Sequence, residues 1–347
     1  MKKTIALFLA LAFAAAMLLT GCTSQAPGAA APAAEAAPAA EAAPATEAAP
    51  AAEAAPAAAG RTLKMGFIFN SLDNPIYVNW RQMLEAECPK YNFELTYLTS
   101  DEDAATELAN MEDLINAGCD VIGMSPADSE ASKEAVKLAN DAGIPVFTLD
   151  RVLEDTQCIT QAITDNYAAA QIAGRKAVEV LGAQGGKIGI IRGIYGLSIE
   201  TDRYEGFMSV IRQHPEIEVV SEVFGDFHRE KGTNAAEDLL QANPDVKLIY
   251  CENGEMAVGC ILAAEAAGYA PGEIVIFGYD GAPDELAGIK DGTLYGCVYQ
   301  VFNVMVPNLI KDVRAYMDGT DIPILCEYGA AFCTKDNIDK YYYEIAS

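Results

Sequence analysis

The sequence predicts an α/β protein whose folded part consists of two doubly wound, Rossmann-like lobes. Short apolar runs alternate with segments of helical length from about residue 63 to residue 317, and the alternation divides into two consecutive series. Strands that alternate with helices of roughly 10–15 residues usually pair in parallel and bury both faces of their sheet. Each series therefore predicts one lobe with helices on both sides of a sheet.

The first series opens with an apolar strand. Its strands are expected at residues 63–70, 93–98, 121–124 and 146–149, and its helices at residues 75–87, 103–117 and 129–142. Asn74 before Pro75 is typical of a helix start, because asparagine caps free N–H groups and proline fits the first helical position. Gly118 and Gly143 are expected to end the two later helices.

The second series repeats this alternation. Its strands are expected at residues 187–192, 218–224, 248–251, 274–279 and 297–300, and its helices at residues 167–181, 198–213, 229–241, 255–267 and 303–317. Polar residues follow several strands of both series. They are Asn70, Ser71, Asp150, Arg151, Asn253 and Asp280. Ligands of open α/β sheets bind beyond the carboxyl ends of the strands, so these residues indicate a binding site, although turns and helix caps use the same residue types.

The N-terminus has the pattern of an export signal. Lys2 and Lys3 precede an apolar run at residues 5–19, which is too short for a comfortable membrane span. The following Leu-Thr-Gly-Cys resembles a bacterial lipobox. We therefore expect residues 1–21 to be a lipoprotein signal peptide and Cys22 to carry the lipid. The alternative is an uncleaved apolar anchor.

Residues 22–60 are expected to form a disordered tether behind the lipidated Cys22. Ala, Pro and Glu dominate the segment, and both Glu and Pro recur every six residues from Pro32 and Glu35 onward. Regular prolines interrupt helices, and the small side chains leave little to bury. The segment is either a spacer that separates the folded part from the membrane or filler without a required length.

Composition argues against several functional classes. The formal net charge of −27 repels nucleic acid and anionic headgroups, so nucleic acid is not an expected partner and lipid is the only expected membrane contact. There is no G-x-x-x-x-G-K-[ST], G-x-G-x-x-G or G-x-S-x-G motif, and two histidines make a catalytic triad implausible, so we expect no enzyme and no cofactor. Without C-x-x-C spacing, no metal site is expected.

The eight cysteines beyond Cys22 are mostly expected to be free thiols. Four of them, Cys119, Cys158, Cys251 and Cys297, lie in or beside apolar strand-like runs, where cysteine commonly acts as a small buried hydrophobe. An exported protein can nevertheless form disulfides. Cys326 and Cys333 are the first pair to test.

Seven segments together resemble the periplasmic sugar-binding proteins of the ribose-binding type. The resemblance covers residues 61 to about 320, and its segments are residues 67–75, 145–151, 164–166, 203–207, 253–257, 278–281 and Gln300. The first two segments resemble the family's opening strand with its Asn-Pro helix start and its strand ending in Asp-Arg. Residues 164–166 and Gln300 resemble its lobe crossings. The other three resemble its Arg-x-x-Gly-Phe helix, its Asn-Asp-Glu-Met-Ala motif and its Gly-Phe-Asp-Gly motif. The resemblance implies the type I periplasmic-binding-protein fold, joined by a three-crossing hinge.

Position by position, the resemblance implies a sugar site. The residues implied to bind hydroxyls are Asn74, Asp150, Arg151, Arg203, Asn253, Asp280 and Gln300, and those implied to flank the ring are Tyr77 and Phe227. Vicinal hydroxyls suit carboxylate, amide and guanidinium partners, and the C–H faces of a sugar suit aromatic walls.

Some positions depart from the family pattern. Asn70 and Ser71 stand where Ser-Thr is usual, and Ile76 replaces a stacking aromatic residue. Trp80, the only tryptophan, lies one helical turn beyond Ile76. It either compensates for the lost wall or packs on the helix face.

The resemblance also implies lobe boundaries and partners. We expect residues 61–165 plus 301–325 in one lobe, residues 166–300 plus 326–347 in the other, and crossings at 165–166, 300–301 and near Leu325. The expected protein is an extracytoplasmic monomer, lipid-anchored to the outer face of the bacterial cytoplasmic membrane or held in the periplasm. It would capture a monosaccharide, a ribose-like pentose or a hexose, for an ABC importer permease. The alternatives are a sensor that presents a sugar or signalling furanose to a membrane receptor, and a sugar-responsive repressor, which the lipobox and the acidic charge disfavour.

Overall fold

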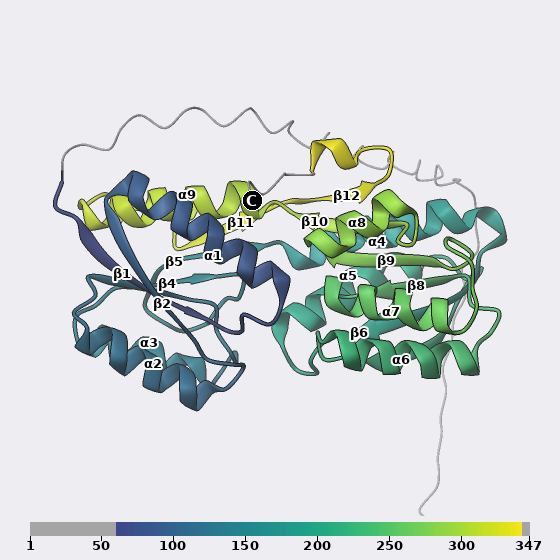
Figure 1. The fold of residues 1–347 in the computed structure, drawn as a ribbon, viewed down its shortest axis with the longest axis horizontal. Helices are drawn as coiled ribbons and strands as arrows, with labels where there is room; N and C mark the ends of the chain where they lie inside the picture. The colour runs from purple at the N-terminus through teal and green to yellow at the C-terminus, as the bar shows by residue number, and fades with distance from the viewer. Residues whose placement is uncertain (1–59, 342–347) are drawn as a thin grey trace, which may run out of the picture. The chain divides into compact units, whose positions relative to one another are not determined.

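The computed structural model describes residues 60–341. The expected signal peptide, Cys22 and the tether up to residue 59 lie outside the described residues, as do residues 342–347. Within the described part, the chain forms two six-stranded sheets, which Figure 1 shows side by side. We call each sheet with its covering helices a lobe.

The first lobe contains the sheet with strand order β11-β5-β4-β3-β1-β2. Its strands are β1 (Leu63–Phe69), β2 (Phe93–Thr99), β3 (Val121–Met124), β4 (Val146–Leu149), β5 (Cys158–Thr164) and β11 (Leu325–Tyr328). Its helices are α1 (Pro75–Glu87), α2 (Ala104–Asn116), α3 (Ser132–Asp141) and α9 (Phe302–Met317), with a 3₁₀ turn at Cys88–Tyr91. All of its strand pairs are parallel.

The second lobe repeats the plan with strand order β12-β10-β9-β8-β6-β7. Its strands are β6 (Gly186–Arg192), β7 (Ile217–Phe224), β8 (Leu248–Cys251), β9 (Val275–Asp280), β10 (Gly296–Gln300) and β12 (Ala330–Thr334). Its helices are α4 (Asn166–Leu181), α5 (Ser198–Ile211), α6 (Arg229–Ala242), α7 (Gly254–Ala266) and α8 (Pro283–Asp291), with 3₁₀ turns at Gly182–Gln184 and Ile338–Lys340. Only β12 runs antiparallel, against β10.

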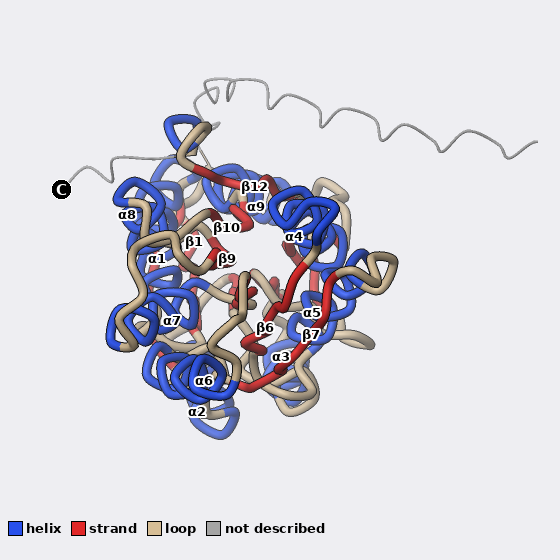
Figure 2. Tube along the Cα trace, turned by 90° about the vertical axis from the view of Figure 1, so that its right-hand side faces the viewer, coloured by secondary structure: helices blue, strands red, loops and turns tan. Residues whose placement is uncertain are grey.

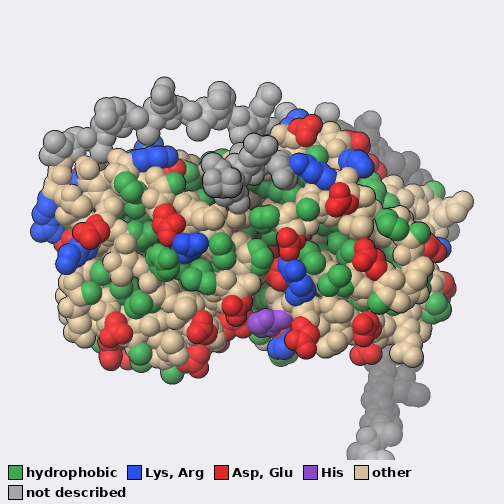
Figure 3. All heavy atoms as spheres, in the orientation of Figure 1, with side chains coloured by type: hydrophobic (Ala, Val, Ile, Leu, Met, Phe, Trp, Pro, Cys, Tyr) green, Lys and Arg blue, Asp and Glu red, His purple; other side chains and the backbone are tan. Residues whose placement is uncertain are grey.

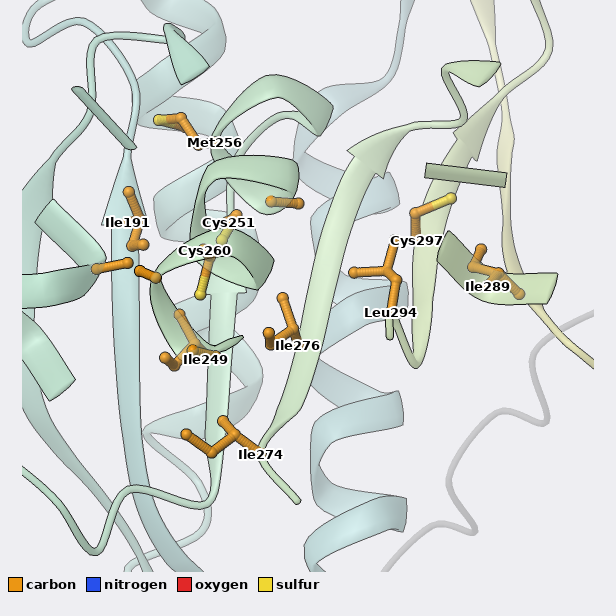
Figure 4. Packing of buried hydrophobic residues seen from close by; sticks show 14 of the residues in the cluster. Ile191, Ile249, Cys251, Met256, Cys260, Ile274, Ile276, Ile289, Leu294 and Cys297 are labelled. Carbon is orange, nitrogen blue, oxygen red and sulfur yellow. The ribbon is translucent and has the colours of Figure 1, made fainter. Parts of the chain in front are cut away.

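Each sheet is buried between two helix layers. In the first lobe α1 and α9 pack on one face, where Trp80 and Phe302 are buried, and α2 and α3 pack on the other. In the second lobe α4 and α5 cover one face while α6, α7 and α8 cover the opposite one, as Figure 2 shows around the strands. Figure 4 shows one of these layers, with Ile249 and Ile276 facing Cys260. The expected fold class is confirmed.

Four elements were missing from the sequence prediction: β5, α8, β11 and β12. The β5 sequence Cys-Ile-Thr-Gln-Ala-Ile-Thr is nearly half polar, so it lacks the apolar run that marks the other central strands. Helix α8 has only 9 residues. Strands β11 and β12 are short and separated by Gly329 alone, so neither gives a periodic signal of its own.

The chain passes between the two sheets three times. It leaves β5 for α4 at Asp165, leaves β10 for α9 at Val301, and leaves β11 for β12 at Gly329. The sequence placed the last passage near Leu325, but Leu325–Tyr328 pairs with β5 in the first sheet.

Among residues 60–341, no helix combines the length and apolar character needed to cross a bilayer.

The cysteine prediction needs one correction. All eight described cysteines are free thiols, and seven of them are buried. Cys326 lies in β11 of the first sheet, where its sulfur is 3.8 Å from the hydroxyl oxygen of Thr160, whereas Cys333 lies in β12 of the second sheet. The suggested Cys326–Cys333 pair is therefore wrong, because the chain changes sheets between the two residues.

Candidate functional site

A cavity of about 340 Å³ opens between the lobes, and residues from both lobes line it. All of the residues singled out from the sequence for ligand binding lie on its wall. They are Asn70, Ser71, Asn74, Ile76, Tyr77, Trp80, Asp150, Arg151, Arg203, Phe227, Asn253, Asp280 and Gln300. A volume of this size lies at the lower end of the range of roughly 300–1,000 Å³ typical of small-molecule pockets.

The topology explains why residues so distant in sequence meet. Each sheet has the doubly wound order in which the second strand lies outside the first and the third strand on the other side. Ser71 follows β1, Asp150 follows β4, Asn253 follows β8, and Asp280 and Gln300 end β9 and β10. The carboxyl ends of parallel strands share one edge of a sheet, and ligand sites of such sheets form there.

Arg203 is a buried cation on the cavity wall that its neighbours hold in place. Its side chain is 3% exposed. The Nε group donates to Asn166 Oδ1 at 2.9 Å, and Nη1 donates to the carbonyl oxygen of Glu252 at 2.7 Å. The guanidinium lies 3.9 Å from the centre of the Tyr279 ring. These contacts fix the guanidinium plane beside the cavity and leave Nη1 3.6 Å from Asp280 Oδ1.

Asp280 lies at the end of β9 with a φ of 105°, a left-handed conformation that is rare for a residue other than glycine. Its Oδ1 accepts from the Gln300 amide at 2.7 Å, and its Oδ2 accepts from the backbone N–H of Gly254 at 3.3 Å. Burial raises the pKa of this carboxyl from 3.8 to about 6, against the lowering effect of Arg203 and with a further increase from Asp150.

Asp150 is the corresponding carboxylate of the first lobe. It is 5% exposed, and its φ of 76° is also left-handed. Burial raises its pKa, while Arg203 and Arg151 act in the opposite direction. Arg203 thus influences both carboxylates, although Asp150 belongs to the other lobe.

Arg151 is held by its own lobe. Its Nη1 donates to the carbonyl oxygens of Pro126 and Ala127 at 2.8 and 3.1 Å, and its Nη2 lies 3.5 Å from the Tyr77 hydroxyl. Its Nε is buried and, within the described part of the chain, has no hydrogen-bond partner. Among the same residues, Oε1 of Gln300 is also buried and unpaired.

The apolar walls differ between the lobes. In the second lobe, the Phe227 ring packs against Gly193, where an added Cβ would lie 2.0 Å from the ring. In the first lobe, Tyr77 contacts Trp80 edge-on, with ring centroids 4.8 Å apart. Trp80 is 1% exposed and also packs on Phe302, so it lies mainly in the core behind Tyr77. Helix-face packing therefore describes Trp80 better than a replacement wall.

Three of the predicted residues also organise the backbone around them. Asn74 Oδ1 accepts from the N–H of Ile76 and caps α1, and Asn253 Oδ1 accepts from the N–H of Met256 and caps α7. Ser71 Oγ accepts from the N–H of Asp73. These three residues therefore do serve as helix caps and a turn residue. The same contacts hold their side chains at the cavity wall.

Sequence reasoning missed part of the cavity wall. The further lining residues are Asp73, Glu102, Ile194, Ile199, His228, Arg229, Glu230, Lys231 and Glu255. His228 Nε2 and Glu102 Oε2, which come from different lobes, lie 3.1 Å apart. Arg229 pairs with Glu255 and Asp284, and Lys231 pairs with Asp226. The cations at the mouth are therefore largely neutralised by neighbouring acids.

Asn166 and Glu252 are supporting residues that no motif marked as functional. Asn166 Oδ1 also accepts from the Tyr279 hydroxyl at 3.0 Å, so it orients Arg203 and Tyr279 together. Glu252 is fully buried and accepts from the N–H of Gly193 at 2.7 Å. Their position directly after the first lobe crossing and after β8 is the signal that could have indicated them.

The surrounding charge favours a neutral ligand over an anionic one. Acidic side chains are spread over the face of both lobes in Figure 3, with Lys and Arg scattered among them. Within residues 60–341, no three His, Cys, Asp or Glu side chains are grouped so as to hold a metal ion. The polar groups that the described lining residues offer to a ligand are carboxylates, amides and guanidinium groups.

Two doubly wound lobes around such a cavity define a two-lobed solute-binding protein. The chain belongs to the periplasmic binding protein domain family, whose model matches residues 65–321. It is similar to the ribose import binding protein of Salmonella typhimurium, with 35% identity over 68% of this chain and 79% of that protein. The ribose import binding protein of Bacillus subtilis is 33% identical over 68% of this chain and 75% of its own length.

A solved structure supports the same relationship. An ABC transporter solute-binding protein from Agrobacterium vitis with bound D-fucose matches 80% of this chain and 97% of its own chain, with a TM-score of 0.74 and 27% identity.

Proposed function

We propose that this protein captures a neutral monosaccharide, a ribose-like pentose or a hexose, between its lobes and delivers it to an ABC importer. The similarity to ribose import binding proteins and to a D-fucose-bound solute-binding protein supports the ligand class and the importer partner. The observation that carries the proposal is the paired set of hydroxyl-binding groups on the cavity wall, Asp150 and Arg151 from the first lobe with Arg203, Asp280 and Gln300 from the second.

The chemistry of these groups suits a sugar. Asp150 and Asp280 can accept hydrogen bonds from neighbouring hydroxyls, while Arg151 Nε and Gln300 Oε1 offer a donor and an acceptor that the described residues leave unpaired. Hydrogen bonds to charged groups contribute about 1.5–3 kcal/mol each. Phe227 and Tyr77 supply the aromatic surfaces for the C–H faces of the ring.

Capture is coupled to closure, because one ligand contacts both lobes. A ligand shifts the equilibrium only by its difference in affinity for the two forms, and contacts to two lobes exist together only when the lobes are closed. Asp165, Val301 and Gly329 lie at the three passages between the sheets and form the proposed hinge. The importer would recognise the closed form, and no chemical conversion of the sugar is part of the proposal.

The proposed attachment to the membrane is a lipid on Cys22. Leu-Thr-Gly-Cys after an apolar run supports it, and residues 23–60 would act as the tether. The protein would then function as an extracytoplasmic monomer at the outer face of the cytoplasmic membrane or in the periplasm.

A thermal-shift screen with pentoses, hexoses, polyols and amino acids tests the proposal, with product analysis of each sugar that shifts the midpoint. We expect one or a few neutral monosaccharides to raise the unfolding midpoint and to be recovered unchanged. Conversion of the bound sugar, or binding of an amino acid with no response to any sugar, would refute the proposal.

A further inference from the structure

Among the twelve described strands, only β10 and β12 pair antiparallel, and two cysteines face each other across this pair. In the β10–β12 ladder, Cys297 lies directly opposite Cys333. Both residues are 0% exposed and belong to the same core cluster, in which Figure 4 shows Cys297 beside Leu294 and Ile289. Directly opposed residues of antiparallel strands have Cα atoms about 4.5–5.5 Å apart, which lies within the span of about 4.4–6.8 Å that a disulfide bridges.

The two thiols already interact. The contact between them raises the pKa of the Cys297 thiol and lowers the pKa of the Cys333 thiol. In a thiol–disulfide exchange the thiolate is the attacking species, and Cys333 lies on the edge strand β12, where an oxidant reaches it before Cys297 on the inner strand β10. Cys297 is then placed to act as the resolving thiol.

The position of β12 gives an oxidant access to this pair. β12 is the edge strand of its sheet, and only the short segment up to residue 341 follows it in the described part of the chain. An edge strand can separate locally from its neighbour at a lower free-energy cost than a central strand. Cys251 and Cys260 also interact with each other, but β8 lies inside the sheet and α7 covers it. That second pair therefore serves as the internal comparison.

We propose that Cys297 and Cys333 are a disulfide site that a small oxidised disulfide such as oxidised glutathione converts to a cystine bridge. The Cys333 thiolate attacks one sulfur of the oxidant, breaks its S–S bond and releases one thiol. Cys297 then attacks the Cys333 sulfur of the mixed disulfide and releases the second thiol. The protein loses two electrons and two protons, and one oxidant disulfide is reduced to two thiols.

The bridge would reinforce the hinge side of the second lobe. Gln300 and Ala330, which pair with each other at one end of the same ladder, adjoin the passages at Val301 and Gly329. A covalent link between Cys297 and Cys333, each four residues from one of these passages, would fix the register of β10 and β12. It would close a chain segment from residue 297 to residue 333, which favours the folded state by restricting the unfolded chain.

Incubation of the purified full-length protein with oxidised glutathione, followed by alkylation and peptide mapping, tests the proposal. We expect the peptides that contain Cys297 and Cys333 to be linked, with a mass lower than that of the reduced pair by two hydrogen atoms. The unfolding midpoint should rise by at least about 3 °C and return on reduction. Cys260→Ser should leave the linked peptide unchanged, whereas Cys333→Ser should abolish it.

Two outcomes would overturn the proposal. They are alkylation of both Cys297 and Cys333 after oxidation, and a bridge that joins Cys251 to Cys260 instead. A linked wild-type peptide without any rise in midpoint would confirm the disulfide site and refute its reinforcement of the lobe. Because the mapping is done on the wild-type chain, it decides the question even if a variant fails to fold.

Discussion

The side-chain amide of Gln300 donates to Asp280 Oδ1 at 2.7 Å, so the last residues of the neighbouring strands β9 and β10 hold one carboxylate against the cavity. The second oxygen of Asp280 lies 3.3 Å from the N–H of Gly254 at the start of α7. Asp280 is thus oriented from two sides, while Arg203 lies 3.6 Å from it. This geometry makes Asp280 the proposed ligand anchor of the second lobe.

Asp280→Ala should lower the affinity for the best sugar by at least about tenfold, because one charged hydrogen bond is worth more than about 1.4 kcal/mol. The fold should persist, since the substitution removes a carboxylate whose ionised form burial disfavours. Calorimetric titration and unfolding midpoints of the wild type and the variant measure both effects. Unchanged affinity with a lowered midpoint would assign Asp280 a purely structural role.

Arg151→Ala should also weaken sugar binding at least about tenfold, but it should destabilise the protein as well. Arg151 donates to the carbonyl oxygens of Pro126 and Ala127, and its removal leaves both without these hydrogen bonds. Arg151→Lys is the matched control, because it keeps the positive charge but not the fork of donors. Comparison of the sugar affinity and the unfolding midpoint of the two variants separates the contribution of Arg151 to sugar binding from its contribution to the stability of the fold. An Arg151→Ala variant with wild-type affinity would contradict the assignment.

Sugar affinity should fall as the pH decreases through about 6. Hydroxyl donors favour the ionised form of Asp280, whose pKa in the unliganded protein is raised to about 6. The effect on the stability of the unliganded protein has the opposite sign. Because the pKa of Asp280 is higher in the folded than in the unfolded chain, the folded state binds the proton more tightly. This contribution to stability is complete below about pH 3.8 and is lost as the pH rises through about 6.

Titrations between pH 5 and 8, with Asp280→Asn in parallel, measure this dependence. The variant should bind more weakly at neutral pH and show a flatter profile, with a residual slope from Asp150, whose pKa is also raised. If the wild type and the variant had the same profile, Asp280 would not be the titrating group.

Gly193→Ala should weaken binding without a direct ligand contact. An added Cβ would lie 2.0 Å from the Phe227 ring, so the ring must move. Phe227 has little freedom to adapt, because its φ of 62° is already left-handed. We expect a loss of affinity of several-fold or more, and partial recovery in Gly193→Ala combined with Phe227→Leu would show that the clash is the cause. Full affinity in the single variant would rule out this aromatic wall.

Cys22→Ser should release the protein from the membrane fraction, because serine cannot carry a thioether-linked lipid. The measurement is fractionation of cells that express either the wild type or the variant. The matched control is Cys326→Ser, which changes a half-buried cysteine in strand β11. Retention of Cys22→Ser in the membrane at the wild-type level would disprove lipidation at this residue.

Residues at strand ends could be predicted from the sequence, and residues that depend on lobe packing could not. Asp150 and Asp280 follow clear apolar strands, and parallel pairing brings such ends to one edge. The contact between His228 and Glu102 spans 126 residues and joins two lobes, so no local pattern encodes it. The same holds for Asn166, which looks like a helix-start residue until Arg203 and Tyr279 are seen to share its side-chain oxygen.

The missed elements show the limits of periodicity. β11 and β12 have 4 and 5 residues, and such short segments carry no pattern that indicates which strand each one pairs with. For this reason the sequence places the last passage between the sheets too early in the chain. Trp80 illustrates a second limit, because its helical spacing from Ile76 fits both a cavity wall and a buried core position. Only the contact with Phe302 distinguishes the two.

A crystal structure of the protein with its best monosaccharide tests the central proposal most directly. We expect one sugar in the cavity, with oxygens within hydrogen-bond distance of Asp150 or Arg151 in the first lobe and of Arg203 or Asp280 in the second lobe at the same time. A sugar bound outside the cavity, or held by one lobe alone, would contradict the proposal that the ligand bridges and closes the two lobes.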